Sequence, residues 1–293
     1  IMLPFITSDL LAVGGSHTAV FVGEGSVETT VIMEDVTIEG FKSAFFSYNR
    51  SGSNIFLGNN ATLKLQQNLV GEWALTRDII FGTGIPDRTE LMCLDLQNYT
   101  MDCEGRSVVV QGNSTAAVLR IKNGRLINPV FDHENTKIIL DSVEIVLAGD
   151  TSFGGAAIDI EGSCTISGEP GSVFRWLSAG NFTLTSGATL RITDGITFCH
   201  DNEGTSNFVM EHTTSTLELI GATFQRKIFG SETPRLTLKI GQLIVDHTST
   251  LNLGNSGIEF GNGDGDENLS VEIRPGATLR VTGTGSLLYN NTY

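Results

Sequence analysis

Apolar and polar residues alternate in short runs along this chain, and turns containing glycine, asparagine or aspartate separate the runs. The pattern is clearest in four copies near the C-terminus, each with a threonine, two aliphatic residues spaced two apart and a later aromatic residue. The copies span 188–198, 215–224, 249–260 and 277–289. Because successive strand residues point to opposite faces, this alternation predicts short β-strands with one buried face.

The spacing of the copies predicts how the strands are organised. Their first aliphatic residues are Leu190, Leu217, Leu251 and Leu279, and the interval from Leu217 to Leu251 is the longest of the three. Intervals of roughly this length are typical of repeat proteins, in which each repeat packs on its neighbours. A third strand is expected between copies, at 208–210, 236–245 and 269–273. We therefore predict an all-β fold, a single-stranded parallel β-helix (β-solenoid) with three strands per rung and right-handed crossovers.

The alternation also predicts which side chains face the interior. The inward set is Leu190, Ile192, Ile196 and Phe198, then Leu217, Leu219 and Phe224, then Leu251, Leu253, Ile258 and Phe260. We expect like residues to stack in adjacent layers, with Leu217 next to Leu251. The outward position between the aliphatic residues is occupied in turn by Arg191, Glu218, Asn252 and Arg280. Opposite charges would then be neighbours across rungs, each pair contributing about 0.2–1 kcal/mol.

The same pattern recurs upstream and predicts one domain over residues 1–293. Looser copies lie at 30–38, 118–127 and 138–145, broken at Glu34-Asp35, Asn123-Gly124 and Asp141-Ser142. We expect rungs over 29–293, irregular at 60–115, and an apolar N-terminal cap or subunit-contact segment at 1–28. A solenoid of this length is reasonable because each rung needs only its neighbours.

Charge excludes several classes of partner. Thirty-three Asp and Glu against eighteen Lys and Arg give a net charge of −15, which repels nucleic-acid phosphates and anionic lipids. The sequence contains no run of 18 apolar residues, so we expect no helix that spans a membrane. Residues 1–13 lack the pattern of a signal peptide. Because the chain starts at Ile1, we expect a mature or trimmed product.

The four cysteines do not form a disulfide framework or a metal-binding motif. Cys93 and Cys103 can pair if their strands are adjacent. Cys164 is in phase with Ile166, so we expect it to be a small buried residue.

Catalytic chemistry has few candidates. Polysaccharide-cleaving β-helix enzymes need two close carboxylates, and Asp35, Asp141 and Asp194 follow first strands, where Asp is also a common turn residue. We interpret these three as turn residues. Residues 120–122 resemble the Arg-Ile-Lys motif of polygalacturonases without its companion motifs, so Ile121 is read as a core residue. The histidines, expected to be solvated at turns and strand ends, are His17, His133, His200, His212 and His247. We expect no enzyme activity and no cofactor.

Two further features of the sequence are a candidate ligand-binding loop and a set of candidate glycosylation sites. The glycine-rich loop 261–268 contains Asp264, Asp266 and Glu267, which are weak calcium candidates and are interpreted as a solvated acidic turn. Glycosylation sequons begin at Asn60, Asn98, Asn113, Asn181, Asn268 and Asn290.

The repeat style resembles the β-helical passengers and surface proteins of bacteria, including autotransporter adhesins and the polymorphic outer-membrane proteins. Residues 154–158, Gly-Gly-Ala-Ala-Ile, resemble the Gly-Gly-Ala-Ile element of the polymorphic family. Residues 46–49 and 56–59 resemble its Phe-x-x-Asn element. The resemblance implies an extracellular structural or adhesive role and assigns no catalytic residue.

The ends of a β-helix predict its partner. Open strands present unpaired N–H and C=O groups that another chain can satisfy. The apolar candidates for this contact are Ile1, Leu3, Phe5, Ile6, Leu287, Leu288 and Tyr289. We therefore expect a structural extracellular or cell-surface protein, a subunit of a filament, shaft or coat that binds copies of itself.

Two other functions stay open at this point. One is an adhesin that binds glycans or a host surface through loops 202–207 and 261–268 and through exposed aromatics, with Trp73 and Trp176 the first to examine. The other is a polysaccharide lyase or hydrolase, which requires a groove with two close carboxylates or a bound calcium.

Overall fold

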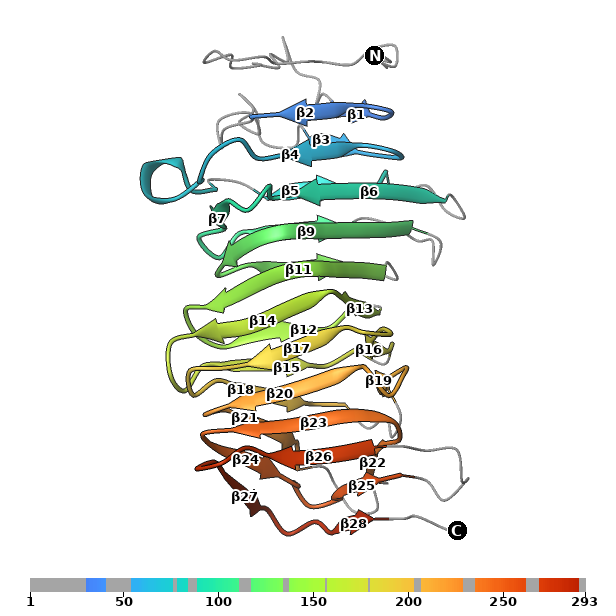
Figure 1. The fold of residues 1–293 in the computed structure, drawn as a ribbon. Coiled ribbons are helices and arrows are strands. Elements are labelled where there is room, and N and C mark those ends of the chain that lie inside the picture. Colours follow the sequence, from blue (N-terminus) through green and yellow to red (C-terminus); the bar gives the residue numbers. More distant parts are fainter. Residues whose placement is uncertain are drawn as a thin grey trace. The chain divides into compact units, whose positions relative to one another are not determined.

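The computed structural model is all-β, with parallel strands stacked as a β-solenoid of about eight turns (Figure 1). It describes residues 30–40, 54–75, 78–83, 89–110, 117–133, 137–155, 157–178, 180–202, 207–228, 235–261 and 269–289. The chain forms two compact units, Ile1–Ile139 and Leu140–Tyr293. The predicted parallel β-helix with three strands per rung is confirmed, and the single domain stays a prediction.

Unit 1 contains two sheets of parallel strands. One has the order β1-β3-β5-β8-β10, and the other includes β2-β4-β6-β9 with β7 beside β9. The elements are β1 (Thr30–Met33), β2 (Thr37–Glu39), β3 (Asn54–Leu57), β4 (Thr62–Lys64), the 3-10 helix η2 (Gly71–Trp73), β5 (Ile79–Phe81), β6 (Glu90–Asp95), β7 (Thr100–Asp102), β8 (Ser107–Val110), β9 (Ala117–Ile127) and β10 (Val130–His133).

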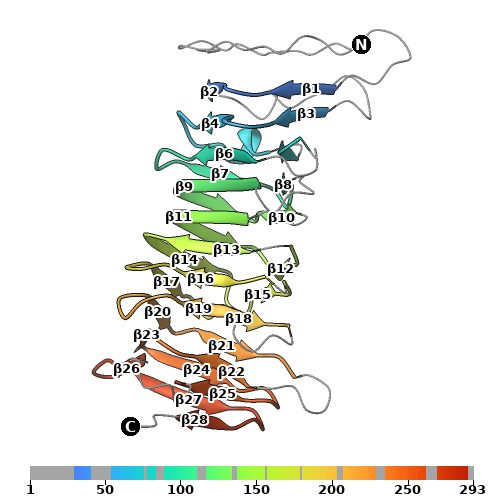
Figure 2. The same cartoon turned by 90° about the vertical axis from the view of Figure 1, so that its right-hand side faces the viewer.

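Unit 2 has three faces. The first is β11-β14-β17-β20-β23-β26, the second is β12-β15-β18-β21-β24-β27, and the third is formed by β13-β16-β19 and β22-β25-β28 (Figure 2). The strands are β11 (Lys137–Leu147), β12 (Thr151–Phe153), β13 (Ile158–Glu161), β14 (Ser163–Gly168), β15 (Val173–Trp176), β16 (Phe182–Leu184), β17 (Thr189–Ile192), β18 (Thr197–His200), β19 (Phe208–Met210), β20 (Thr216–Ile220), β21 (Thr223–Arg226), β22 (Leu236–Leu238), β23 (Gly241–Asp246), β24 (Thr248–Asn252), β25 (Ile258–Phe260), β26 (Leu269–Ile273), β27 (Thr278–Thr282) and β28 (Leu287–Tyr289).

All eleven predicted inward residues are buried, so alternation identified this part of the core correctly. Stacked aromatic rings form its centre. Phe198 on β18 lies between Phe174 and Phe224, with ring centroids 5.5 Å from each. Phe182 and Phe208 from the third face stack on each other at 5.4 Å and meet Phe198 edge-on at 5.2 and 5.6 Å. One aromatic column therefore packs against another across the interior.

The predicted stacking of Leu217 on Leu251 is wrong. Leu190 stands opposite Leu217 as expected, but Leu217 next meets Leu243 on β23, and Leu251 lies in the second sheet opposite Phe224. The threonine-leucine pattern lies in the first strand of a rung at β17 and β20, but in the second strand at β24 and β27.

The rung length is therefore more regular than the four copies indicated. Positions in register on the first face are Cys164, Leu190, Leu217, Leu243 and Val271, which are almost evenly spaced along the chain. The expected third strand 236–245 consists of two strands, β22 and β23, and residues 269–273 form the first strand of the next rung, β26.

Upstream, the predicted breaks take two forms. At Asp35, φ is +52° and a turn separates β1 from β2. At Asn123 and Ser142, φ is +57° and +59°, yet β9 and β11 continue through these residues. A single left-handed residue therefore bends these two strands without ending them.

Candidate functional site

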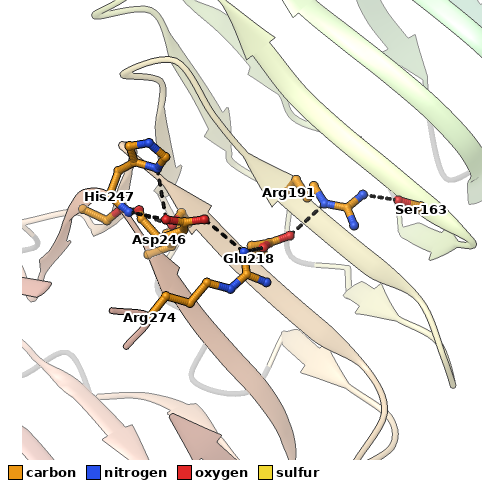
Figure 3. Close-up of polar contacts among 8 residues, drawn as sticks. Ser163, Arg191, Glu218, Asp246, His247 and Arg274 are labelled. Carbon is orange, nitrogen blue, oxygen red and sulfur yellow. Dashed lines mark hydrogen bonds and ion pairs between the residues drawn. The ribbon is translucent and has the colours of Figure 1, made fainter. Parts of the chain in front are cut away.

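A ladder of ion pairs crosses the outer face of the first sheet of unit 2 (Figure 3). Arg191 on β17 stands opposite Glu218 on β20 and donates from Nε to Glu218 Oε2 at 2.7 Å, while its Nη1 donates to Ser163 Oγ. Arg274, which follows β26, donates from Nη1 to Glu218 Oε1 at 2.7 Å and to Asp246 Oδ2 at 3.0 Å. Four strands of the face are thus connected through one carboxylate that is 4% exposed.

The charges of this ladder compensate one another. Hydrogen bonding from Arg274 lowers the pKa of the Asp246 carboxyl, and the same bond raises the pKa of Arg274. His247 lies beside Asp246, with its backbone N–H 2.8 Å and its Nδ1 3.1 Å from Asp246 Oδ1. The two carboxylates therefore act as clamps, because each accepts from an arginine of another strand or strand end.

Charges also alternate along the outer face of unit 1. The register aligns Glu39, Lys64, Asp95 and Lys122 on β2, β4, β6 and β9. Lys64 Nζ lies 3.1 Å from Glu39, and Lys122 Nζ lies 3.2 Å from Asp95. The predicted neighbouring of opposite charges is confirmed for Arg191 and Glu218. It is wrong for Arg280, because β27 sets Arg280 opposite Thr250.

Replacement of Glu218 by glutamine is expected to lower the free energy of unfolding by about 1–2 kcal/mol, because two charge-assisted hydrogen bonds to a buried carboxylate become neutral ones. Urea unfolding at pH 7 would measure the change. The matched control is Asp150→Asn, whose carboxylate is exposed and pairs with Arg175 at 3.3 Å; exposed pairs typically contribute less than about 1 kcal/mol. Equal losses in the two variants would contradict the clamp.

A second polar cluster lies inside the solenoid. His200 ends β18 and Arg226 ends β21, and both are 0% exposed and stand opposite each other. Arg226 Nη1 contacts His200 Nδ1 and also donates to the carbonyl oxygen of Asn202 at 2.7 Å. His200 Nε2 lies 2.6 Å from Oδ1 of Asn207.

The amides of this cluster extend to a neighbouring rung. Asn207 Nδ2 donates to Oδ1 of Asn202 at 2.8 Å, and Asn202 Nδ2 donates to the carbonyl oxygen of Ser178 at 2.7 Å. Burial and the charge of Arg226 lower the pKa of His200 to about 4. The expectation that His200 is solvated is therefore wrong, whereas His212 and His247 are exposed.

The rung formed by β26, β27 and β28, which we call the open rung, exposes apolar side chains. Val271 stands opposite Leu243, but Val271 is 43% exposed and Leu243 is 1% exposed. The other large apolar residues exposed on this rung are Ile273, Val281, Leu287, Leu288 and Tyr289. Three of the predicted contact residues, Leu287, Leu288 and Tyr289, thus lie on the surface. The other four, Ile1, Leu3, Phe5 and Ile6, lie outside the described residues.

None of the strand registers within the described residues sets two of the three candidate acids, Asp35, Asp141 and Asp194, opposite each other. Asp35 and Asp194 have φ of +52° and +57°, typical of turns, and Asp141 precedes Ser142, whose φ is +59°. Asp35 accepts a hydrogen bond from Asn60 at 2.8 Å, and Asp194 accepts one from Thr193 at 2.8 Å. This geometry agrees with the interpretation of Asp35 and Asp194 as turn residues. The same interpretation is wrong for Asp141, which lies within β11 where that strand continues through Ser142.

The two tryptophans considered for glycan binding differ in burial. Trp176 is fully buried and stacks on Phe153 at 4.9 Å, so it offers no face to a glycan, while Trp73 is 41% exposed.

The two cysteines considered for a disulfide, Cys93 and Cys103, are free thiols. Cys93 occupies an outward position opposite Arg120, whereas Cys103 is buried inside, which explains why they do not pair.

Two other residues that were predicted to be buried, Cys164 and Ile121, are buried in the structure. Cys164 is buried as expected, and burial raises the pKa of its thiol to about 11. Ile121 is a core residue, between the partly exposed side chains of Arg120 and Lys122.

Several candidates lie beyond the described residues. The calcium candidates Asp264, Asp266 and Glu267 are among them, as are the sequons at Asn113, Asn268 and Asn290. The sequon residues Asn60, Asn98 and Asn181 are exposed.

Within the described ranges, His, Cys, Asp and Glu side chains do not gather in groups of three that could hold a metal ion. No helix of the described part of the chain has the length and apolar character needed to cross a membrane. Comparisons of the chain with protein-family models, with curated proteins and with solved structures each found no match.

Proposed function

We propose that the chain is a structural protein of the cell surface or extracellular space, a subunit of a filament, shaft or coat that joins copies of itself through its solenoid ends. The open rung carries this proposal. Its positions Val271 and Ile273 are in register with buried residues of β23, so the rung presents an interior face to solvent. A second copy that adds strands to β26, β27 and β28 would cover this face.

Strand addition suits this surface physically. The outer edges of β26, β27 and β28 have no neighbouring strand within the described residues, and unpaired edge groups favour pairing with another chain. The ladder supports the role, because Arg274 fixes the end of β26 to Glu218 and Asp246. An edge that is held rigidly loses less conformational entropy when a partner binds.

The extracellular location rests on the resemblance to bacterial β-helical surface proteins, and an autotransporter-type or polymorphic outer-membrane-type identity is the narrower form of the proposal. The net charge of −15 is consistent with this proposal, because it favours solubility and disfavours binding to nucleic acids.

Charges placed on the open rung are expected to weaken self-association at least tenfold. The double variant Ile273→Lys/Val281→Lys puts two ammonium groups where apolar side chains would be covered, and losing about 1 kcal/mol at each position corresponds to more than a tenfold change in affinity. Mass photometry across a concentration series would measure the association, and electron microscopy would show whether the product is a filament or a closed oligomer.

The control for this experiment is Ile228→Lys, which changes an apolar residue that is 70% exposed but lies outside the open rung, after β21. Circular dichroism would establish that both variants fold. A wild-type chain that is monomeric at all concentrations, or equal association of the two variants, would contradict the proposal.

A glycan- or host-binding adhesin is the alternative function. The observation that favours it is the exposure of Trp73 on η2, next to Val70, which is 38% exposed, because aromatic faces stack on sugar rings. A glycan array on which wild type binds and Trp73→Ala does not would support this alternative.

A further inference from the structure

The hydrogen-bond chemistry of the buried cluster fixes the protonation state of His200. An arginine side chain only donates hydrogen bonds, so His200 Nδ1, which Arg226 Nη1 contacts, must be the unprotonated acceptor. The neutral ring then carries its proton on Nε2, which donates to Oδ1 of Asn207 at 2.6 Å. Neutral His200 thus connects the guanidinium to the amide chain of Asn207 and Asn202.

We infer that His200 and Arg226 form an acid-sensitive latch that holds the corner of the solenoid at the ends of β15, β18 and β21 and the start of β19. Protonation of His200 removes the acceptor for Arg226 and places two cations in contact at positions that are 0% exposed. Burial of an uncompensated charge is costly. The corner should therefore open when His200 gains a proton.

The surrounding charges do not offset this effect. Directly after β18, Asp201 lies 2.5 Å from Lys227, which follows β21, and 3.8 Å from Arg175 on β15. This carboxylate is therefore paired with two cations already. The groups in register with or bonded to His200 from β15, β21 and the start of β19 are Trp176, Arg226 and Asn207. Arg226 is the charged member of these three.

The direction of the pH effect follows from the chemistry. His200 has a pKa of about 4 in the folded protein against 6.5 for an ordinary histidine, so the unfolded chain binds the proton more readily. The resulting stability is fully present above pH 6.5 and is lost as the pH falls toward 4. Between pH 7 and pH 4 the ratio of folded to unfolded unit 2 should fall about a hundredfold through this residue.

Urea unfolding of wild type, His200→Gln and His212→Gln at several pH values between 7 and 4.5 tests the latch. Glutamine stays neutral and can accept from Arg226 and donate to Asn207, so the His200→Gln variant should lose the component of the pH dependence that His200 contributes. His212→Gln removes an exposed histidine and should retain the wild-type pH dependence. Identical profiles for wild type and His200→Gln would overturn the inference.

An NMR titration of the wild-type protein labelled at histidine keeps the test decisive even if His200→Gln fails to fold. The ring carbons and nitrogens of His200 should report a proton on Nε2 at pH 7 and a transition near pH 4. A transition at or above pH 6.5, or a proton on Nδ1 at pH 7, would refute the latch.

Discussion

Replacement of Phe198 by alanine is expected to destabilise unit 2 by about 4 kcal/mol. Truncation of a fully buried phenylalanine typically costs about 3–5 kcal/mol, and Phe198 is 0% exposed with four aromatic neighbours at centroid distances of 5.2–5.6 Å. Each favourable ring pair adds about 0.5–1.5 kcal/mol beyond its buried area. Urea unfolding followed by tryptophan fluorescence would measure the loss, because Trp176 lies in the same aromatic core, 5.3 Å from Phe182.

Two control variants separate packing from simple loss of apolar area. Phe198→Leu keeps most of the volume and should cost clearly less than Phe198→Ala. Ile228→Ala changes a residue that is 70% exposed and should shift the free energy of unfolding by less than about 0.5 kcal/mol. A cost for Phe198→Ala below about 1.5 kcal/mol would show that the rings do not form the centre of the core.

The inward residues could be predicted from sequence because burial on one face imposes a strict period of two. The assignment of strands to sheets could not. A threonine followed by two alternating aliphatics suits any strand with one buried face, so the pattern at 249–253 fits the second face as well as the first. The longer interval from Leu217 to Leu251 was the one feature of the four copies that indicated a different sheet for Leu251. Positions in register repeat after a shorter and nearly constant interval, such as that from Leu190 to Leu217.

The buried polar cluster was also encoded in the alternation. His200 follows the inward Phe198 by two residues, and Arg226 follows the inward Phe224 by two, so the period places both side chains inside. General expectations for histidine and arginine favoured solvent instead. The compensating partners, Asn202 and Asn207, lie outside β18 and β19, where strand periodicity makes no prediction.

The ion-pair ladder was predictable only for residues within strands. Arg191 and Glu218 occupy matching outward positions, and their pairing followed from the pattern. Arg274 comes after the end of β26, and its side chain reaches Glu218 across β23, where the outward residue in register is Ile244. Such a contact depends on side-chain reach beyond the nearest rung, which strand periodicity does not specify.

Introduction of a methyl group at Gly168 is expected to cost about 3 kcal/mol or more, the second of the two largest effects. Gly168 ends β14 opposite Leu147, with φ of +142°. A Cβ atom there would lie 2.1 Å from the carbonyl oxygen and 2.6 Å from the nitrogen of Leu147. Because the obstacle is backbone of the adjacent rung, Gly168→Ala must separate β14 from β11, and hydrogen bonds of the sheet would be lost with the packing.

Two other glycines of unit 2 separate the close approach from backbone strain. Gly171→Ala shares the positive φ, at +94°, but has open space around its Cβ position, so it should cost about 1 kcal/mol. Gly154→Ala has open space and no positive φ, and it should change the free energy of unfolding by less than about 0.5 kcal/mol. Urea midpoints that rank Gly154→Ala, Gly171→Ala and Gly168→Ala in this order of increasing loss would support the stacked register of β11 and β14. Equal losses for Gly168→Ala and Gly171→Ala would contradict it, because strain alone would then account for both.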